Sequence, residues 1–296
     1  MTHLRSNLRN QQTLAQPAAV QGFGYWSGRD IRVEFRPAAV DTGLVFIRAD
    51  LPQSPRIPVQ VGHRVEMPRR TSLAVDGASV EMIEHVVAAL QGLGVDNCEI
   101  VVDGLEMPGC DGSSQPFVTA IDAAGIVEQE AIQPRLVITE QTRVGTQESW
   151  VEARPAPKGT RLSIQYKLDY GPNTPIGKQS IDLVVTPQSF RRELAPARTF
   201  LLAEEAQWLR ERGLGQRVTP QDLLIFSAEG LLENELRFEN ECVRHKTLDL
   251  VGDLALSGCE IVGQIIAYRS GHRLNAELVK VLLSEGRKEA PRRRSA

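Results

Sequence analysis

The chain has 296 residues, of which 42% are hydrophobic and 24% are charged, as in ordinary globular proteins. The formal net charge is -3, which excludes the strongly basic character that favours a nucleic-acid-binding protein. No stretch approaches about 18 consecutive apolar residues, so we expect no membrane span. At about 150 residues per domain, the length favours two domains.

The cysteines and the N-terminus indicate a cytoplasmic protein. Residues 1–15 are polar and lack the apolar segment of a signal peptide. No two of the four cysteines form a Cys-x2-Cys pair, so neither a thiolate zinc finger nor a secreted disulfide framework is predicted. We therefore expect reduced thiols in a cytoplasmic protein, and a monomer is the default expectation.

Residues 1–18 are expected to form a flexible leader, followed by a first domain at residues 19–127. Period-two alternation or short apolar runs predict strands at residues 31–35, 44–48 and 98–102. Apolar residues at helical spacing predict a helix from Ser79 to Leu93, which Gly94 ends. A further helix is predicted at residues 116–124, with Pro116 in its first turn.

A polar segment at residues 128–134 ends in Pro134 and is interpreted as a linker to a second domain at residues 135–286. The same patterns predict further strands at residues 136–139, 150–153, 161–166, 181–185 and 260–268. Helices are predicted at residues 190–195, 201–212, 241–256 and 275–283. The basic tail at residues 287–296 is interpreted as a solvated end.

The two halves share an order of elements: strands, a helix that contains a histidine, a strand and a helix. Locally, Cys98-Glu99-Ile100-Val101 resembles Cys259-Glu260-Ile261-Val262. This order predicts an α+β fold of two similar domains, as from the duplication of one α+β unit. Because domain interfaces favour ligand sites, we expect the active site in the cleft between the two domains.

Three of the five histidines lie in polar clusters, whereas His3 and His63 are interpreted as solvated. His245 and Asp249 are four residues apart on a predicted helix, so both project from one face. This pair alone is also compatible with a surface helix, and His85 is equally compatible with a buried structural histidine. A catalytic zinc site commonly has three such protein ligands and one open position for water. His85, His245 and Asp249 would supply the three ligands.

Two other groups could serve a hydrolysis at such a metal. Glu84 precedes a candidate ligand and is a candidate general base, while His272 is a candidate general acid. Asp253 lies one turn beyond Asp249 and could keep the His272 imidazole protonated.

Motifs in the same order along nearly the whole chain resemble the zinc-dependent UDP-3-O-acyl-N-acetylglucosamine deacetylase family of lipid A biosynthesis. The resemblance rests on Glu84-His85 with Ala88-Ala89-Leu90-Gln91-Gly92-Leu93-Gly94-Val95-Asp96-Asn97, on Asp111-Gly112-Ser113-Ser114-Gln115-Pro116-Phe117, on Ala197-Arg198-Thr199-Phe200, on Arg237-Phe238-Glu239-Asn240-Glu241 with Val243-Arg244-His245-Lys246-x-x-Asp249 and Gly252-Asp253-Leu254, and on Ala267-Tyr268-Arg269-Ser270-Gly271-His272.

The resemblance implies two α+β domains, each a β-sheet layered with α-helices, and a role for each matching residue. It implies metal ligands (His85, His245, Asp249), a general base (Glu84), a general acid (His272) and its orienting partner (Asp253). It also implies that Thr199 stabilises the oxyanion, that Lys246 lies near the polar head of the substrate and that Phe200 packs against the sugar or at the acyl entrance. An insert near residues 201–232 is implied to form a hydrophobic acyl passage with Leu214, Leu223, Leu224, Ile225 and Phe226.

The sequence departs from the family pattern at three places. Trp26 replaces a histidine, Met82-Ile83 replaces Thr-Val, and residues 169–172 replace an Asp-His-Pro segment. Because the metal and acid–base residues are intact, the resemblance implies deacetylation of an amphiphilic UDP-sugar with Zn²⁺, or Fe²⁺, as cofactor. The alternatives are a deacetylase of a related N-acyl sugar nucleotide and a catalytically silent zinc-binding relative.

Overall fold

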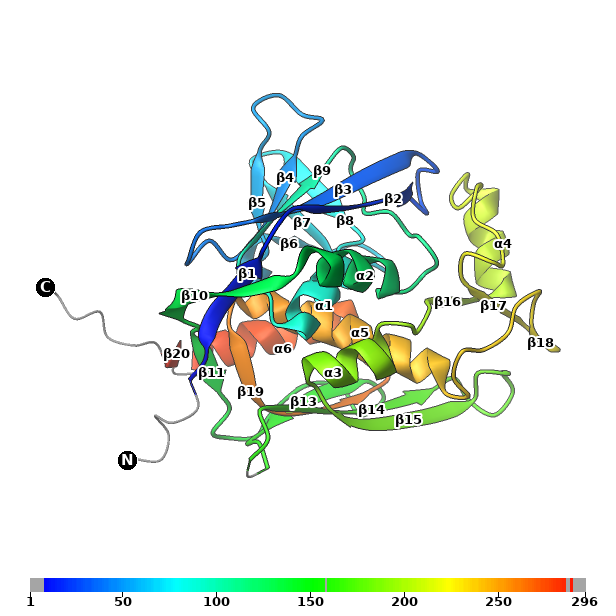
Figure 1. Ribbon diagram of the computed structural model, residues 1–296. Coiled ribbons are helices and arrows are strands. Elements are labelled where there is room, and N and C mark those ends of the chain that lie inside the picture. The colour runs from blue at the N-terminus through cyan, green and yellow to red at the C-terminus, as the bar shows by residue number, and fades with distance from the viewer. Residues whose placement is uncertain (1–7, 158, 286–287, 290–296) are drawn as a thin grey trace, which may run out of the picture.

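The computed structural model describes residues 8–157, 159–285 and 288–289 (Figure 1). His3 and most of the predicted basic tail lie outside the described residues. The fold is mixed α and β, with sheets on the outside and a layer of helices between them (Figure 1). Within the described ranges, none of the helices combines the length and the hydropathy that a membrane crossing requires.

The first half of the chain contributes two sheets and two helices. Buried residues alternate along β3, where Ile31, Val33 and Phe35 point into the core. The five-stranded sheet has the order β2 (Ala18–Phe23), β3 (Asp30–Pro37), β9 (Cys98–Val102), β4 (Leu44–Arg48) and β5 (Arg56–Pro58). The three-stranded sheet contains β6 (Arg64–Val65), β7 (Ser72–Val75) and β8 (Ala78–Glu81), and the helices are α1 (Glu84–Leu93) and α2 (Gln115–Ala124).

The second half contributes a seven-stranded sheet in which β19 pairs with β11, β13 and β14. Its strands are β11 (Arg135–Val137), β12 (Thr142–Gly145), β13 (Trp150–Arg154), β14 (Leu162–Asp169), β15 (Lys178–Val184), β19 (Glu260–Tyr268) and β20 (Lys288–Glu289). The longer helices are α5 (Glu241–Leu254) and α6 (His272–Glu285). Shorter helical turns lie at Val61–His63, Pro187–Ser189 (α3), Phe190–Leu194 and Ala255–Ser257.

Two smaller units complete the fold. A three-stranded sheet of β16 (Phe200–Leu202), β17 (Leu224–Ser227) and β18 (Gly230–Leu231) lies beside α4 (Ala203–Glu211), at the right of Figure 1. A two-stranded ribbon pairs β1 (Asn10–Leu14) with β10 (Ile126–Ile132).

The helix layer joins the two halves, because α1 of the first half packs against α5 of the second. Gly252 makes this contact close, since a Cβ at this position would collide with the backbone carbonyl of Glu84 on α1. One hydrophobic core runs through both halves and includes Val86 of α1 and Leu248 of α5. The close packing places the first turn of α1 opposite the middle of α5, where the candidate ligands lie.

Several expectations about local structure were wrong. Asn10–Leu14 is a strand rather than part of a loose leader, because it pairs with β10, which in turn covers most of the expected linker. Residues 79–81 belong to β8, which pairs with β7, and the chain turns into α1 at Met82 with a φ of 56°. Phe200–Leu202 is likewise a strand, so the helix expected at residue 201 begins at Ala203.

Candidate active site

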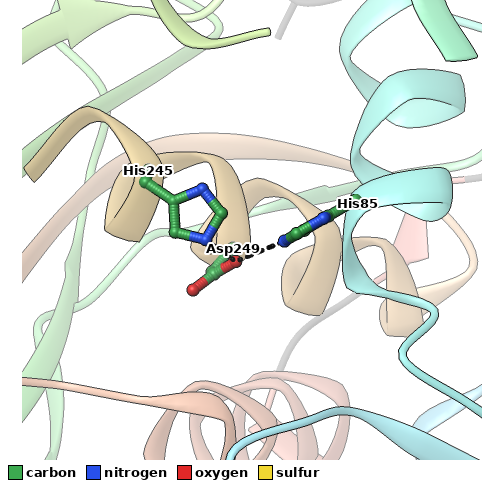
Figure 2. Close-up of side chains that lie close together, drawn as sticks. All are labelled: His85, His245 and Asp249. Atoms are coloured by element: carbon green, nitrogen blue, oxygen red, sulfur yellow. Dashed lines mark ion pairs between the residues drawn. The ribbon is translucent and has the colours of Figure 1, made fainter. Parts of the chain in front are cut away.

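The candidate metal ligands lie on the two helices that meet at the centre of the molecule. His85 is the second residue of α1, and His245 and Asp249 lie one turn apart on α5 (Figure 2). All three side chains point toward one another, and one ligand atom from each lies within 4.8 Å of the others. The spacing seen in the sequence and the contact between the helices thus together build a three-residue cluster.

Distances within the cluster are those of groups that share an ion rather than a hydrogen bond. Asp249 Oδ1 is 3.5 Å from His245 Nε2 and 3.7 Å from His85 Nε2. All three residues are buried. Within the described part of the chain, Asp249 Oδ1 is a buried oxygen without a hydrogen-bond partner. Because an unpaired buried carboxylate oxygen is costly, this donor set fits a bound cation.

The orientation of His245 supports this fit. Its Nδ1 lies 3.1 Å from the backbone carbonyl oxygen of Ala197. When Nδ1 donates its proton to that carbonyl, Nε2 keeps its lone pair and faces the cluster. Backbone carbonyls commonly orient metal-bound histidines in this way.

The protonation states also suit a metal. Burial and the neighbouring His245 lower the pKa of His85 to about 3, and burial also lowers the pKa of His245. Burial opposes ionisation of Asp249, but Lys246 and the imidazoles outweigh it and hold the pKa of this carboxyl well below its usual range. Two neutral imidazoles and a carboxylate are the forms that bind a divalent cation without first losing protons.

An acid–base pair lies beside the cluster. His272 Nε2 is 3.9 Å from Glu84 Oε1, and His272 Nδ1 is 2.9 Å from Asp253 Oδ2. Burial raises the pKa of Glu84 to about 7. Burial lowers the pKa of His272, but Asp253, Glu84 and Asp249 outweigh this and raise it to about 9. Near neutral pH the pair therefore contains a carboxyl group that can accept a proton and an imidazolium that can donate one.

The other candidate residues lie around the same centre. Lys246 Nζ is 2.7 Å from Asp249 Oδ2, and this carboxylate outweighs burial and raises the pKa of Lys246. Thr199 donates its backbone N–H to Gly112 O at 2.7 Å. The ring of Phe200 stands 6.3 Å from that of His245 in an edge-to-face arrangement.

A cavity of about 900 Å³ is lined by most of these groups, namely Glu84, His85, Thr199, Phe200, His245, Lys246, Asp249 and His272, whereas Asp253 contacts His272 without lining the cavity. Two residues that depart from the family pattern also line it: Trp26, with the Arg70 guanidinium 4.5 Å from its ring centroid, and Tyr170, whose ring is 5.7 Å from that of Phe200. One wall is apolar and comes from the unit that contains α4: Leu201, Ala206, Leu209, Leu214, Val218, Leu223 and Ile225. Leu224 and Phe226, which were expected with them, lie in the hydrophobic core.

Residues that the sequence analysis did not assign hold the site from behind. Thr71 donates hydrogen bonds to both Glu84 and Asp253. Arg198, which precedes Thr199, forms a buried ion pair with Glu241, which lies one turn before His245 on α5. Arg198 and Glu241 belong to motifs that resemble the family, and this membership could have identified them from the sequence. Thr71 belongs to none of these motifs.

Comparisons with known proteins agree with the geometry. The family model of UDP-3-O-acyl N-acetylglycosamine deacetylase matches residues 11–284. The UDP-3-O-acyl-N-acetylglucosamine deacetylase of Thermosynechococcus vestitus is 39% identical over 275 residues, which cover 93% of this chain and 94% of that protein. The proteins of the same name from Chlamydia felis and Brucella ovis are each 36% identical and cover 94% and 93% of this chain, with 98% and 96% of their own lengths matched.

The match extends from β1 to α6 and so includes both helices that form the cluster and the histidine at the start of α6. The chain therefore belongs to the UDP-3-O-acyl N-acetylglycosamine deacetylase family.

Proposed function

We propose that this chain removes the N-acetyl group from UDP-3-O-acyl-N-acetylglucosamine by metal-dependent hydrolysis, releasing acetate and a free amine. One observation supports this above the others: an acid–base pair, Glu84 and His272, faces a three-residue ligand cluster within a single cavity. The substrate is taken from the names of the relatives, and the chemistry of the cavity suits it.

The metal would be held by His85, His245 and Asp249, and we propose Zn²⁺ as the ion. Two imidazoles and one carboxylate are a usual ligand set of catalytic zinc, and they also suit Fe²⁺. When bound, the metal would supply Lewis acidity, which polarises an amide carbonyl and makes water a better nucleophile near neutral pH.

The reaction needs one proton taken and one proton given. Glu84 accepts a proton from the attacking water while the oxygen of that water bonds to the acetyl carbon. His272 donates its proton to the amide nitrogen as the carbon–nitrogen bond breaks, so that acetate and the amine leave. Asp253 orients the His272 imidazole through the 2.9 Å contact with Nδ1.

Other cavity residues are assigned to parts of the substrate. Thr199 stands beside the cluster, where a hydroxyl can stabilise the negative charge that develops on the carbonyl oxygen. Lys246 adds a buried positive charge, which suits the oxygen-rich polar part of the substrate. Phe200 and the apolar wall formed by the α4 unit suit the sugar face and the 3-O-acyl chain.

The reaction would be a step of lipid A biosynthesis, carried out in the cytoplasm by a monomer. The alternative substrate is a related N-acyl sugar nucleotide, because Trp26 and Tyr170, which depart from the family pattern, both line the cavity.

Mass spectrometry of a reaction with purified protein tests the proposal. UDP-3-O-acyl-N-acetylglucosamine should lose only its acetyl group and keep the 3-O-acyl chain. UDP-N-acetylglucosamine, which lacks the acyl chain, is the matched control and should react far more slowly, because it leaves the apolar wall unused. Loss of the O-acyl chain, or faster turnover of the control, would contradict the assignment of the cavity.

A further inference from the structure

Thr71 joins the proposed base to the residue that orients the proposed acid. It immediately precedes β7, in the first half of the chain, and its side chain reaches α5 in the second half. The residue is 1% exposed. It is therefore buried where the start of β7 meets α1 and α5, and it does not line the cavity.

Every polar group of Thr71 is used there. Its backbone N–H donates to Glu84 Oε2 at 3.0 Å, and its carbonyl oxygen accepts the N–H of Ile83, just before α1, at 3.3 Å. Its hydroxyl donates to Asp253 Oδ1 at 2.6 Å. The hydroxyl must be the donor in this last contact, because an ionised carboxylate can only accept.

The second oxygen of Asp253 is held by two other donors. His272 Nδ1 lies 2.9 Å and Asn275 Nδ2 lies 2.8 Å from Oδ2. Thr71 is thus the partner that fixes the opposite oxygen and stops the carboxylate from rotating away from the imidazole. The short distance to Oδ1 is typical of a charge-assisted hydrogen bond.

We propose that Thr71 is a positioning residue that fixes the general acid and the general base relative to each other through one hydroxyl and one backbone amide. The inference rests on the proposed function. It assigns Thr71 no contact with substrate: the residue acts through Asp253 on His272 and directly on the carboxylate of Glu84.

The test compares two substitutions that differ in the hydroxyl. Thr71→Val keeps the shape and the backbone N–H but removes the donor, while Thr71→Ser keeps the donor. We expect Thr71→Val to lower kcat about 10–100-fold, as the loss of such supporting contacts commonly does, with KM and metal content unchanged. Thr71→Ser should retain most of the turnover.

Thr13→Val is the matched control. Thr13 is also buried, its hydroxyl donates to Asn97 O at 2.7 Å, and neither residue lines the cavity. This control should leave kcat unchanged. An equal loss in both Thr71 variants, or the same loss in Thr13→Val, would show that packing alone matters and would overturn the proposal.

A double substitution and the signals of the His272 ring test the route through Asp253 independently. In an Asp253→Asn background, Thr71→Val should lower kcat little further, because the route through Asp253 is already broken. Additive losses would contradict the route. The nuclear magnetic resonance signals of the His272 ring should change in Thr71→Val but not in Thr71→Ser, and unchanged signals would overturn the proposal. This readout needs no substrate, so it separates failure of the Thr71 inference from failure of the proposed deacetylation, which wild-type turnover tests.

Discussion

Arg198 and Glu241 form an ion pair that is almost completely buried, with Arg198 Nε 2.8 Å from Glu241 Oε1 and the side chains 5% and 0% exposed. Arg198 lies between Ala197, whose carbonyl contacts His245 Nδ1, and Thr199. Glu241 is the first residue of α5, one turn before His245. The pair therefore fastens the segment that contains Thr199 to the helix that contains two candidate ligands.

Replacement of Glu241 by glutamine should destabilise the fold strongly. The substitution leaves the Arg198 guanidinium buried without its counter-charge, which costs about 3–5 kcal/mol of unfolding free energy. Urea denaturation measures the change. The control is Asp122→Asn, which breaks the exposed pair with Arg191 and should cost under about 1 kcal/mol. Similar losses of unfolding free energy in both variants would contradict a large contribution of the buried pair to stability.

Metal content and turnover should separate when ligands and acid–base residues are replaced in turn. His245→Ala removes a proposed ligand and should lose both metal and turnover. Glu84→Gln should keep the metal and lose turnover about 10²–10⁴-fold, the usual contribution of a general base. Metal analysis and acetate release on the same samples measure both.

The control for these variants is His63→Ala, because His63 Nδ1 lies 3.1 Å from Pro58 O and His63 does not line the cavity. This variant should keep metal and turnover. A fully metallated His245→Ala protein would contradict the ligand set, and normal turnover in Glu84→Gln would contradict the base.

The pH dependence of kcat/KM should have an alkaline limb near the pKa of His272, which its carboxylate neighbours raise to about 9. The titratable groups around this imidazole include the carboxyl groups of Asp253, Glu84, Asp249 and, farther out, Glu66, together with the imidazoles of His85 and His245. Because the protonated form is the acid, turnover should fall as pH rises through this value. Asp253→Asn removes the closest negative charge, so the limb should move to lower pH. A limb that stays in place would contradict the pairing of Asp253 with His272.

Gly252→Ala should push α1 and α5 apart. A Cβ at Gly252 collides with the carbonyl of Glu84, and such overpacking typically costs about 1–3 kcal/mol. Since His85 follows Glu84, metal affinity should also fall. Calorimetry and metal titration measure the two effects. Gly62→Ala, where an added Cβ meets no atom within 4 Å, should change neither. Wild-type metal affinity in Gly252→Ala would contradict the close contact.

Much of the fold could be predicted from local pattern. Strands were predicted at residues 44–48, 98–102 and 260–268, and β4, β9 and β19 have these bounds. Each is a short apolar run between polar or glycine residues, so the pattern and the final packing agree. In contrast, β1 reads Asn-Gln-Gln-Thr-Leu and is a strand only because β10, more than a hundred residues later, pairs with it.

The candidate site likewise contains some residues that local pattern predicts and others that only the packing brings together. His245 and Asp249 could be predicted as neighbours because helical spacing places them on one face. His85 was grouped with them by its ligand chemistry, and the family resemblance then implied the same set. Thr71 could not be predicted, because its contacts depend on how β7 sits against α5 across the two halves. Supporting residues of this kind follow from packing rather than from sequence spacing.

Reconstitution of the metal-free protein tests the central claim most directly. Chelator-treated protein should release no acetate from UDP-3-O-acyl-N-acetylglucosamine. Turnover should then rise in proportion to added Zn²⁺ and level off at about one ion per chain, as expected for a single three-ligand catalytic site. Full turnover without metal, or saturation with metal but no acetate release, would contradict the account.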